Sequence, residues 1–327
     1  MKIYHLPDLT LRDTLPPGCV AVLGFFDGVH AGHRELFRRA AAGSAGRQVV
    51  AWTFFSGSRE NLLTDDATRF RLLGEAGADY VAAEDFDDFR SLSGEEFVRD
   101  VLCGLLGVSC AVCGESFRFG RGASCGAEDL MRFCGDAGIG CTAVPSVMSD
   151  GEAVSSSLIR RLVRSGDVRR AARLLGREHF YSLPVVRGKR LGRELGFPTL
   201  NQIIPKNLVS PAPGVYACRV SFEEDGAARD LPGVCNMGTC PTVNEAELEE
   251  FLKENPGYVL PEEATLGSDV LETHVIGETP DLYGKVVRVS LCEKLRDEKK
   301  FDSLHELSLA VAADRRHAEE YFAKAGT

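Results

Sequence analysis

The sequence predicts an α/β domain with a doubly wound parallel sheet over residues 1–182 and an antiparallel β-barrel domain over residues 183–327. Three observations lead to this prediction. The chain has 327 residues, whereas one domain usually has roughly 100 to 200. In the first half, short apolar runs alternate with helical patterns, which indicates parallel strands buried on both faces. In the second half, short valine-rich runs are separated by Gly, Pro, Asp and Asn, which is typical of antiparallel strands.

The first half contains five apolar runs that we predict to be strands. They cover residues 19–25, 48–55, 78–83, 109–114 and 140–147. Helical patterns follow from about residue 32 and over residues 66–76, 94–106 and 128–136. Five glycines fall just after predicted helices, where a left-handed cap residue is expected; they are Gly74, Gly77, Gly107, Gly138 and Gly140. Residues 155–177 are also helical in pattern, with a break at Gly166 and Asp167.

The second half contains five further predicted strands and one long helix. The strands cover residues 183–188, 214–222, 231–238, 271–277 and 285–295, and the helix covers residues 303–324. We expect this helix to close the barrel domain. An acidic, mainly helical insertion at residues 244–268 separates two of the strands, and we expect it to lie on the surface because insertions concentrate in loops.

The composition excludes several classes of protein. The chain is 44% hydrophobic and 26% charged, which is ordinary for a globular protein. A net charge of -10 argues against a broad nucleic-acid surface, although basic residues can gather around a phosphorylated ligand. No apolar run approaches the roughly 18 to 20 residues of a membrane span, and the N-terminal segment does not have the pattern of a secretory signal. We expect a cytoplasmic protein that binds neither nucleic acid nor a membrane; its oligomeric state stays open.

The cysteines do not form the pattern of a disulfide framework. Eleven of them are scattered along the chain, so we expect reduced thiols. Cys110 and Cys113 have the spacing of metal ligands, but no second pair or nearby histidine completes a set of four. Buried structural thiols are therefore favoured over a zinc site at these two residues.

The segment GFFDGVHAGH, residues 24–33, has two histidines at the point where the first predicted strand meets a helix. Ligands of open α/β sheets bind at the carboxyl ends of strands, where a helix N-terminus attracts anions. His30 and His33 would add donors for phosphate oxygens and would stabilise charge that develops on phosphorus. The glycines would let a nucleotide approach the backbone. We favour this phosphate site over surface or core histidines.

This segment resembles the HxGH signature of the nucleotidyltransferase superfamily, in the form found in prokaryotic bifunctional riboflavin kinase/FAD synthetases. Three further matches follow in order: residues 114–120 (GESFRFG), residues 155–177, and the entire second half. The resemblance therefore covers nearly the whole chain. It implies that the first, Rossmann-like domain transfers AMP from ATP to FMN and releases pyrophosphate. It also implies that the second domain phosphorylates riboflavin with ATP.

The resemblance implies residue roles in the first domain. His30 and His33 would hold and neutralise phosphates, while Ser156 and Arg160 would bind the β and γ groups. A guanidinium at a helix start suits this role because it binds phosphate oxygens in pairs. The later arginines of this segment fit a solvated basic helix face. The other nucleotide-binding candidates are Gly24, Phe25, Asp27 and Gly32.

Residues 188–201 (GKRLGRELGFPTLN) resemble the ATP-binding stretch of riboflavin kinases. Thr199 and Asn201 of its PTxN element are the expected Mg²⁺ ligands, because this ion prefers oxygen donors. In isolation, such a motif would equally suit a turn at a strand end. The backbone N–H groups of glycines can surround phosphates, so the ATP-binding candidates are Gly188, Gly192, Gly196 and Pro198.

The strand LETHVI carries Glu272, on which the resemblance places the catalytic base. Its carboxylate would take the proton of the riboflavin 5′-hydroxyl as the γ-phosphoryl group arrives. Without the resemblance, an exposed strand glutamate paired with a lysine would be favoured. Residues 281–285 and 294–307 match segments that cover the flavin pocket in the family, and Tyr283 and Arg296 are the expected contacts there.

The sequence departs from the family pattern in the first domain. Residues 53–58 read TFFSGS where the family has a Phe-x-Pro-His-Pro turn, which helps to bind the adenylylation substrates. Ser116 replaces an Asp or Asn, and Arg69 replaces a Lys. We favour a bifunctional enzyme. The departures favour an alternative, a riboflavin kinase whose first domain only binds nucleotide or flavin. A third possibility is that the first domain is a nucleotidyltransferase for another phosphorylated substrate. The flavin-kinase motifs of the second domain argue against it.

Overall fold

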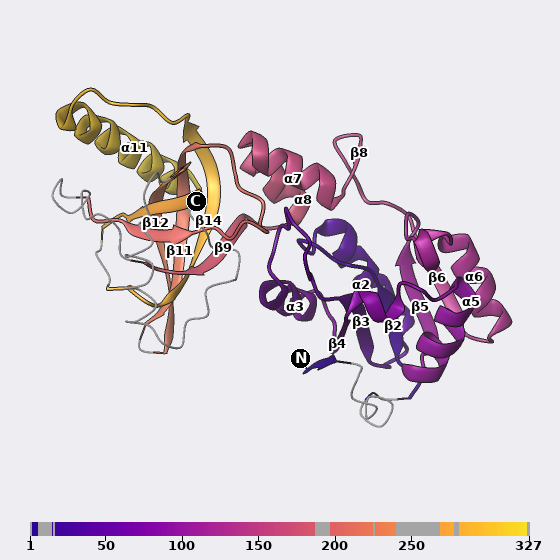
Figure 1. The fold of residues 1–327 in the computed structure, drawn as a ribbon. Coiled ribbons are helices and arrows are strands. Elements are labelled where there is room, and N and C mark those ends of the chain that lie inside the picture. The colour runs from indigo at the N-terminus through magenta and orange to yellow at the C-terminus, as the bar shows by residue number, and fades with distance from the viewer. Residues whose placement is uncertain are drawn as a thin grey trace. The chain divides into compact units, whose positions relative to one another are not determined.

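The structure, a computed structural model, describes residues 2–5, 15, 17–186, 197–224, 226–239, 269–277 and 281–325 (Figure 1). The chain forms two compact units. The first unit comprises Met1–Arg59 and Thr64–Ser156, and the second comprises Glu60–Leu63 and Ser157–Thr327. The predicted boundary between residues 182 and 183 stays a prediction. The insertion at residues 244–268 lies outside the described residues.

The first unit is built on a sheet of six strands in the order β1-β4-β3-β2-β5-β6, and all of its pairings are parallel. The strands are β1 (Lys2–His5), β2 (Val20–Leu23), β3 (Val49–Phe54), β4 (Tyr80–Glu84), β5 (Cys110–Gly114) and β6 (Gly140–Val144). After the edge strand β1, the chain enters the centre with β2, moves outward through β3 to β4, which pairs with β1, and returns to the other side of β2 with β5. This order confirms the doubly wound prediction, and it places a ligand crevice at the carboxyl ends of β2 and β5.

Helices flank this sheet and bury its strands (Figure 1). They are α2 (Ala31–Gly43), α3 (Asp66–Glu75), α4 (Phe86–Phe89), α5 (Gly94–Glu96), η1 (Phe97–Leu105), η2 (Arg121–Ala123) and α6 (Ala127–Asp136). Trp52 of β3, Leu102 of η1 and Leu130 of α6 lie in one apolar cluster. Outside that cluster, α2 contacts β2, β3 and β5 and buries Leu36 and Phe37.

Two details of the helices differ from the prediction. The helix predicted over residues 94–106 is a single α-turn, α5, followed by the π-helix η1. Gly77, Gly107 and Gly138 have left-handed backbones, with φ of 109°, 60° and 73°, as predicted. The prediction was wrong for two other glycines, because α3 still includes Gly74 and β6 already begins at Gly140.

Two short helices and a hairpin follow the first sheet. The hairpin pairs β7 (Met148–Ser149) with β8 (Glu152–Ala153). The predicted helix break is confirmed, because α7 (Ser156–Ser165) ends before Gly166, which has a φ of 80°, and α8 (Val168–Leu175) follows. The Asp167 side chain caps α8 by accepting the Arg170 N–H at 3.1 Å. A left-handed glycine and a fresh N-cap therefore separate the two helices.

The second unit contains an antiparallel sheet of six strands in the order β10-β13-β12-β11-β14-β9. The strands are β9 (His179–Pro184), β10 (Leu200–Ile203), β11 (Gly214–Glu224), β12 (Ala227–Thr239), β13 (Asp269–Val275) and β14 (Val286–Arg296). The two outer strands meet: Val186, just after β9, bridges Asn201 of β10. The buried Gln202 amide donates to the carbonyls of Leu183 and Val287 at 2.6 and 2.8 Å. The sheet therefore curls into the predicted barrel, against which α11 (Leu304–Ala325) packs.

Candidate functional site

The turn between β2 and α2 has an unusual backbone. Phe26, Gly28 and Val29 have φ of 61°, 77° and 41°, and two of these residues are not glycine. Such conformations cost energy and tend to cluster at functional sites. A Cβ atom on Gly24 would lie 2.8 Å from the Phe26 ring. Glycine at position 24 therefore allows the Phe26 ring to fold back over the end of the strand.

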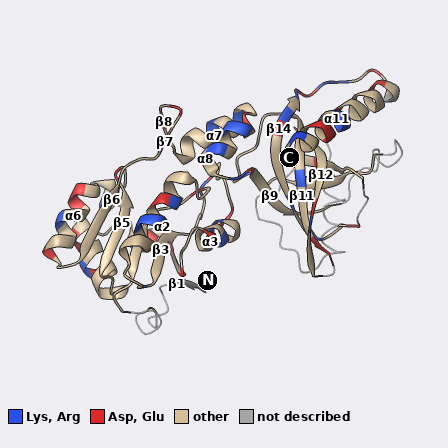
Figure 2. Ribbon diagram, turned by 180° about the vertical axis from the view of Figure 1, so that it is seen from behind, with Lys and Arg blue, Asp and Glu red and all other residues tan. Residues whose placement is uncertain are grey.

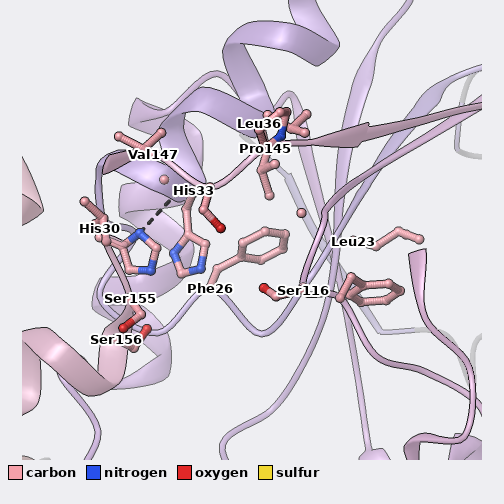
Figure 3. Close-up of a pocket in the computed structure, with 17 residues that line it drawn as sticks. Leu23, Phe26, His30, His33, Leu36, Ser116, Pro145, Val147, Ser155 and Ser156 are labelled. Atoms are coloured by element: carbon pink, nitrogen blue, oxygen red, sulfur yellow. Dashed lines mark hydrogen bonds between the residues drawn. The ribbon is translucent and has the colours of Figure 1, made fainter. Parts of the chain in front are cut away.

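His30 and His33 form a stacked pair at the start of α2 (Figure 3). Their ring centroids are 3.6 Å apart with an interplanar angle of 17°. His30 caps α2, because its Nδ1 accepts the backbone N–H of His33 at 3.3 Å. In neutral His30 the ring proton is therefore on Nε2, which makes that atom the donor. A Cβ atom on Gly32 would lie 3.1 Å from the His30 ring, so glycine is needed where the ring sits.

The environment of the pair keeps His33 neutral. Burial lowers the pKa of His33 well below its usual 6.5, and the neighbouring positive charges of His30 and Arg69 lower it further. Two charged imidazoles in a stack would repel each other. A bound anion would act in the opposite direction, because a nearby negative charge favours the protonated form. Binding of a phosphate beside the pair should therefore raise the pKa of His33.

A pocket with a volume of about 260 Å³ opens beside these histidines. The ends of β2, β5 and β6, the first turns of α2 and the start of α7 line it, so it occupies the crevice expected where the strand order reverses. The residues predicted from the sequence that line it are Gly24, His30, Gly32, His33 and Ser156. Phe25, Asp27 and Arg160 do not line it. Ser116, one of the departures from the family pattern, does.

Ser156 connects the start of α7 to the turn. Its hydroxyl donates to the Asp27 carbonyl at 2.8 Å. Arg160 belongs to the second unit, and its guanidinium donates to the Ser157 hydroxyl at 3.5 Å. Figure 2 shows the basic residues of α7 and α8. One of these residues, Arg169, pairs with Glu293 at 2.9 Å, so part of this basic face makes ion pairs within its own unit.

The second unit brings polar side chains together on one face of the barrel. Asn201 of β10 and Asn236 of β12 are both register partners of Glu272 on β13. Directly opposed residues of antiparallel strands point to the same face, with Cβ atoms roughly 5 Å apart. Partial desolvation by nearby protein atoms raises the pKa of the Glu272 carboxyl, although solvent still reaches it. Sequence reasoning missed Asn236, whose signal was a lone amide in the apolar run LPGVCNMG.

The PTxN element leads into β10. Pro198 and Thr199 directly precede this strand, and the Pro198 carbonyl lies 3.0 Å from Nδ1 of His274 on β13. Thr199 and Asn201 supply hydroxyl and amide oxygens, which fit a hard divalent cation, and Glu272 is the register partner of Asn201. Gly188, Gly192 and Gly196 lie outside the described residues.

The cysteine pair with metal-ligand spacing lies on β5. Cys113 is buried in the apolar cluster of the first unit, and Cys110 is half-buried. Across the described ranges, no group of three or more His, Cys, Asp or Glu residues is placed to hold a metal ion.

Two family models match the chain, one described as FAD synthetase over residues 13–158 and one described as riboflavin kinase over residues 175–322. A bifunctional riboflavin kinase/FMN adenylyltransferase from Escherichia coli (strain K12) is 33% identical over 316 residues, which cover 93% of each chain. A protein of the same name from Bacillus subtilis (strain 168) is 29% identical over 336 residues, which cover 98% of each chain. The chain belongs to the bifunctional riboflavin kinase/FMN adenylyltransferase family.

A solved structure is similar over almost the whole chain. It is described as a macrolide-efflux protein from Streptococcus pneumoniae and has a TM-score of 0.78 with 26% identity, covering 97% of this chain and 98% of that one. Within the described residues of this chain, no helix is both long enough and apolar enough to cross a membrane. Both activities in the family name use ATP, and such enzymes generally need a divalent metal.

The remaining predicted flavin contacts of this family member lie at two edges of the barrel. Tyr283 is 41% exposed on a turn whose Gly284 N–H donates to the Val185 carbonyl at 2.9 Å. Arg296 forms a two-pronged ion pair with the buried Asp314, with N···O distances of 2.9 and 2.8 Å. This pair ties the end of β14 to α11. A contact between Arg296 and flavin stays a prediction.

Acid should destabilise the first unit through His33. The pKa of His33 lies below 6.5 in the folded chain and near 6.5 in the unfolded chain. At pH values between these two pKa values, the unfolded chain therefore binds a proton that the folded chain does not bind. The penalty is absent above about pH 6.5 and grows as the pH falls, by up to about 1.4 kcal/mol per pH unit. Urea unfolding at pH 7.5 and 5.5, followed by fluorescence of the single tryptophan, Trp52, should show a larger loss for wild type than for His33→Gln. Equal losses would contradict the buried neutral imidazole.

Proposed function

We propose that the first unit transfers AMP from ATP to FMN, and that the second unit makes this FMN from riboflavin and a second ATP, each with Mg²⁺. The stacked histidine pair at the α2 N-terminus carries the first assignment. It presents imidazole N–H donors and helix N–H groups to one pocket at the strand ends. The row of Asn201, Glu272 and Asn236 across three strands supports the second assignment.

In the adenylylation step, an oxygen of the FMN phosphate attacks the α-phosphorus of ATP. The bond from that phosphorus to the bridging oxygen breaks, and pyrophosphate leaves. His30 donates from Nε2, and neutral His33 donates its ring N–H to the phosphate oxygens as negative charge accumulates. Ser156 would bind the leaving pyrophosphate, and the same role for Arg160 stays a prediction from the resemblance. No covalent enzyme intermediate is needed, because positioning and charge stabilisation supply the catalysis.

In the kinase step, the 5′-hydroxyl oxygen of riboflavin attacks the γ-phosphorus of ATP and ADP leaves. The Glu272 carboxylate accepts the hydroxyl proton, and its raised pKa makes it a better base than an ordinary exposed glutamate. Mg²⁺ held by Thr199 and Asn201 would neutralise charge on the transferred phosphoryl group. Backbone groups of the glycine-rich stretch before Pro198 bind the remaining phosphates.

The alternative function is a riboflavin kinase whose first domain does not adenylylate FMN. Neither relative named above favours it, because both carry the bifunctional name. The substitutions remove side chains from the first unit but do not leave the loop after β3 without contacts. That loop is well defined here: Ser56 donates to Asp66 through both its backbone N–H and its hydroxyl. We therefore keep the bifunctional proposal.

Removing His33 should separate the two reactions. In His33→Ala, formation of FAD from FMN should fall by about 100-fold or more, because one donor to the developing charge is lost. Formation of FMN from riboflavin should stay within twofold of wild type. Chromatographic separation of riboflavin, FMN and FAD measures both rates in one preparation. His317→Ala, at an exposed position of α11, is the control. Unchanged FAD formation in His33→Ala would exclude the phosphate-binding role.

Replacing Glu272 should give the opposite pattern. Glu272→Gln keeps the size of the side chain but cannot accept the hydroxyl proton, so FMN formation should fall by about 100-fold or more. FAD formation from supplied FMN should remain at the wild-type rate. Glu223→Gln, an exposed position of β11, should leave both rates unchanged. A Glu272→Gln enzyme that phosphorylates riboflavin normally would show that another group is the base.

A further inference from the structure

Arg69 on α3 joins three separate segments of the first unit. Its side chain has no exposed surface. Nη1 donates to the Phe25 carbonyl and to the Thr53 hydroxyl, the latter at 3.3 Å. Nη2 donates to the Phe54 carbonyl and to the Asp66 carboxylate, both at 2.6 Å. One buried guanidinium therefore connects the turn after β2, the end of β3 and the start of α3.

The same carboxylate organises the loop after β3. Asp66 accepts the Ser56 hydroxyl at 2.5 Å and the Ser56 backbone N–H at 3.0 Å. The neighbouring Phe55 N–H donates to the Glu84 carbonyl at 2.8 Å. Ser56, Asp66 and Arg69 thus form one hydrogen-bonded network, and it holds a loop that has no proline.

We propose that Arg69 is a positioning residue for FMN adenylylation, and that its network with Asp66 and Ser56 holds the proline-free loop after β3 against the turn after β2. This inference rests on the proposed function of the first unit. The substitutions at positions 56 and 69 are then one linked change rather than two separate losses. A lysine could not substitute for Arg69 here, because a single ammonium group does not form the planar fork that reaches two carbonyls and a carboxylate together.

The network connects to the reacting groups through Phe25 and Phe26. The guanidinium of Arg69 lies 4.2 Å from the centroid of the Phe25 ring, and that of Arg59 lies 4.4 Å from it. Next in the chain, the Phe26 ring packs edge-on against His33 at 5.3 Å. The histidines have supports of their own, because Ser156 holds the Asp27 carbonyl at 2.8 Å and His30 caps α2. A shift of the Phe25 carbonyl should therefore displace the Phe25 ring and the loop after β3 more than the histidine pair.

The network lies away from the pocket that we assign to ATP. Ser56, Asp66 and Arg69 do not line that pocket, and neither does Phe25. Their displacement should therefore act on the second adenylylation substrate, FMN, through the Phe25 turn and the loop of residues 54–58. We expect the effect in the KM for FMN rather than in the KM for ATP.

The test uses the full chain and the family residue itself. In Arg69→Lys, the KM for FMN in FAD formation should rise at least tenfold, while the KM for ATP and the riboflavin kinase rate stay within twofold of wild type. Arg71→Lys is the matched control, because Arg71 lies on the same helix but is exposed and pairs with Glu75. All of its parameters should stay within twofold. Amide hydrogen exchange in residues 54–58 should be faster in Arg69→Lys than in wild type or in Arg71→Lys.

Two kinetic outcomes would overturn the inference alone. The first is an Arg69→Lys enzyme with the wild-type KM for FMN. The second is a similar change in the KM for FMN, the KM for ATP and kcat, because such a change indicates a general loss of structure. If Arg69→Lys does not fold, Ser56→Ala gives the test. The KM for FMN should then rise about threefold, and the KM for ATP should not change. An unchanged KM for FMN would exclude the positioning role of the network. A wild-type chain that makes no FAD from FMN would overturn the proposed function, and this inference with it.

Discussion

The first unit depends on the turn by which the chain leaves β2 and enters α2. Between Gly24 and Val29 the backbone takes left-handed conformations at two residues that are not glycine, a strain that persists only where surrounding contacts impose it. Those contacts come from two segments that are far apart in the sequence. Arg69 holds the Phe25 carbonyl, and Ser156 holds the Asp27 carbonyl. Held in this way, the turn places His30 as the helix cap and stacks it on His33.

The two units assemble donors for phosphate chemistry by different means. The parallel sheet gathers strand ends and a helix N-terminus at one edge, so its site is made of backbone N–H groups and imidazoles that attract anions. The barrel instead uses strand register, which places Asn201, Glu272 and Asn236 side by side across three strands. Its side chains offer oxygen atoms, which suit a divalent cation and a general base. Each architecture thus supplies the kind of donor that its proposed reaction needs.

Sequence periodicity predicted most strands, the helix break at Gly166 and the closing helix, because these features depend on local pattern and turn chemistry. It missed β1, β7, β8 and β10, each of which has two to four residues and is too short for a pattern to show. The motif predicted the histidine pair but not its stacking, which depends on side-chain packing. Asn236 and the Asp66 contacts of Ser56 and Arg69 could not be predicted, since they depend on strand register and tertiary structure rather than on sequence spacing.

Product stoichiometry shows whether one chain carries out both reactions, because only the adenylylation step releases pyrophosphate. Purified wild-type protein would be incubated with riboflavin, ATP and Mg²⁺, and separately with FMN in place of riboflavin, while FMN, FAD and pyrophosphate are measured over time. We predict that FMN precedes FAD in the first reaction and that FAD forms without delay in the second. One pyrophosphate should appear for each FAD and none for each FMN. FMN that forms without FAD or pyrophosphate in the first reaction, and FMN that stays unchanged in the second, would show that the first unit does not adenylylate FMN.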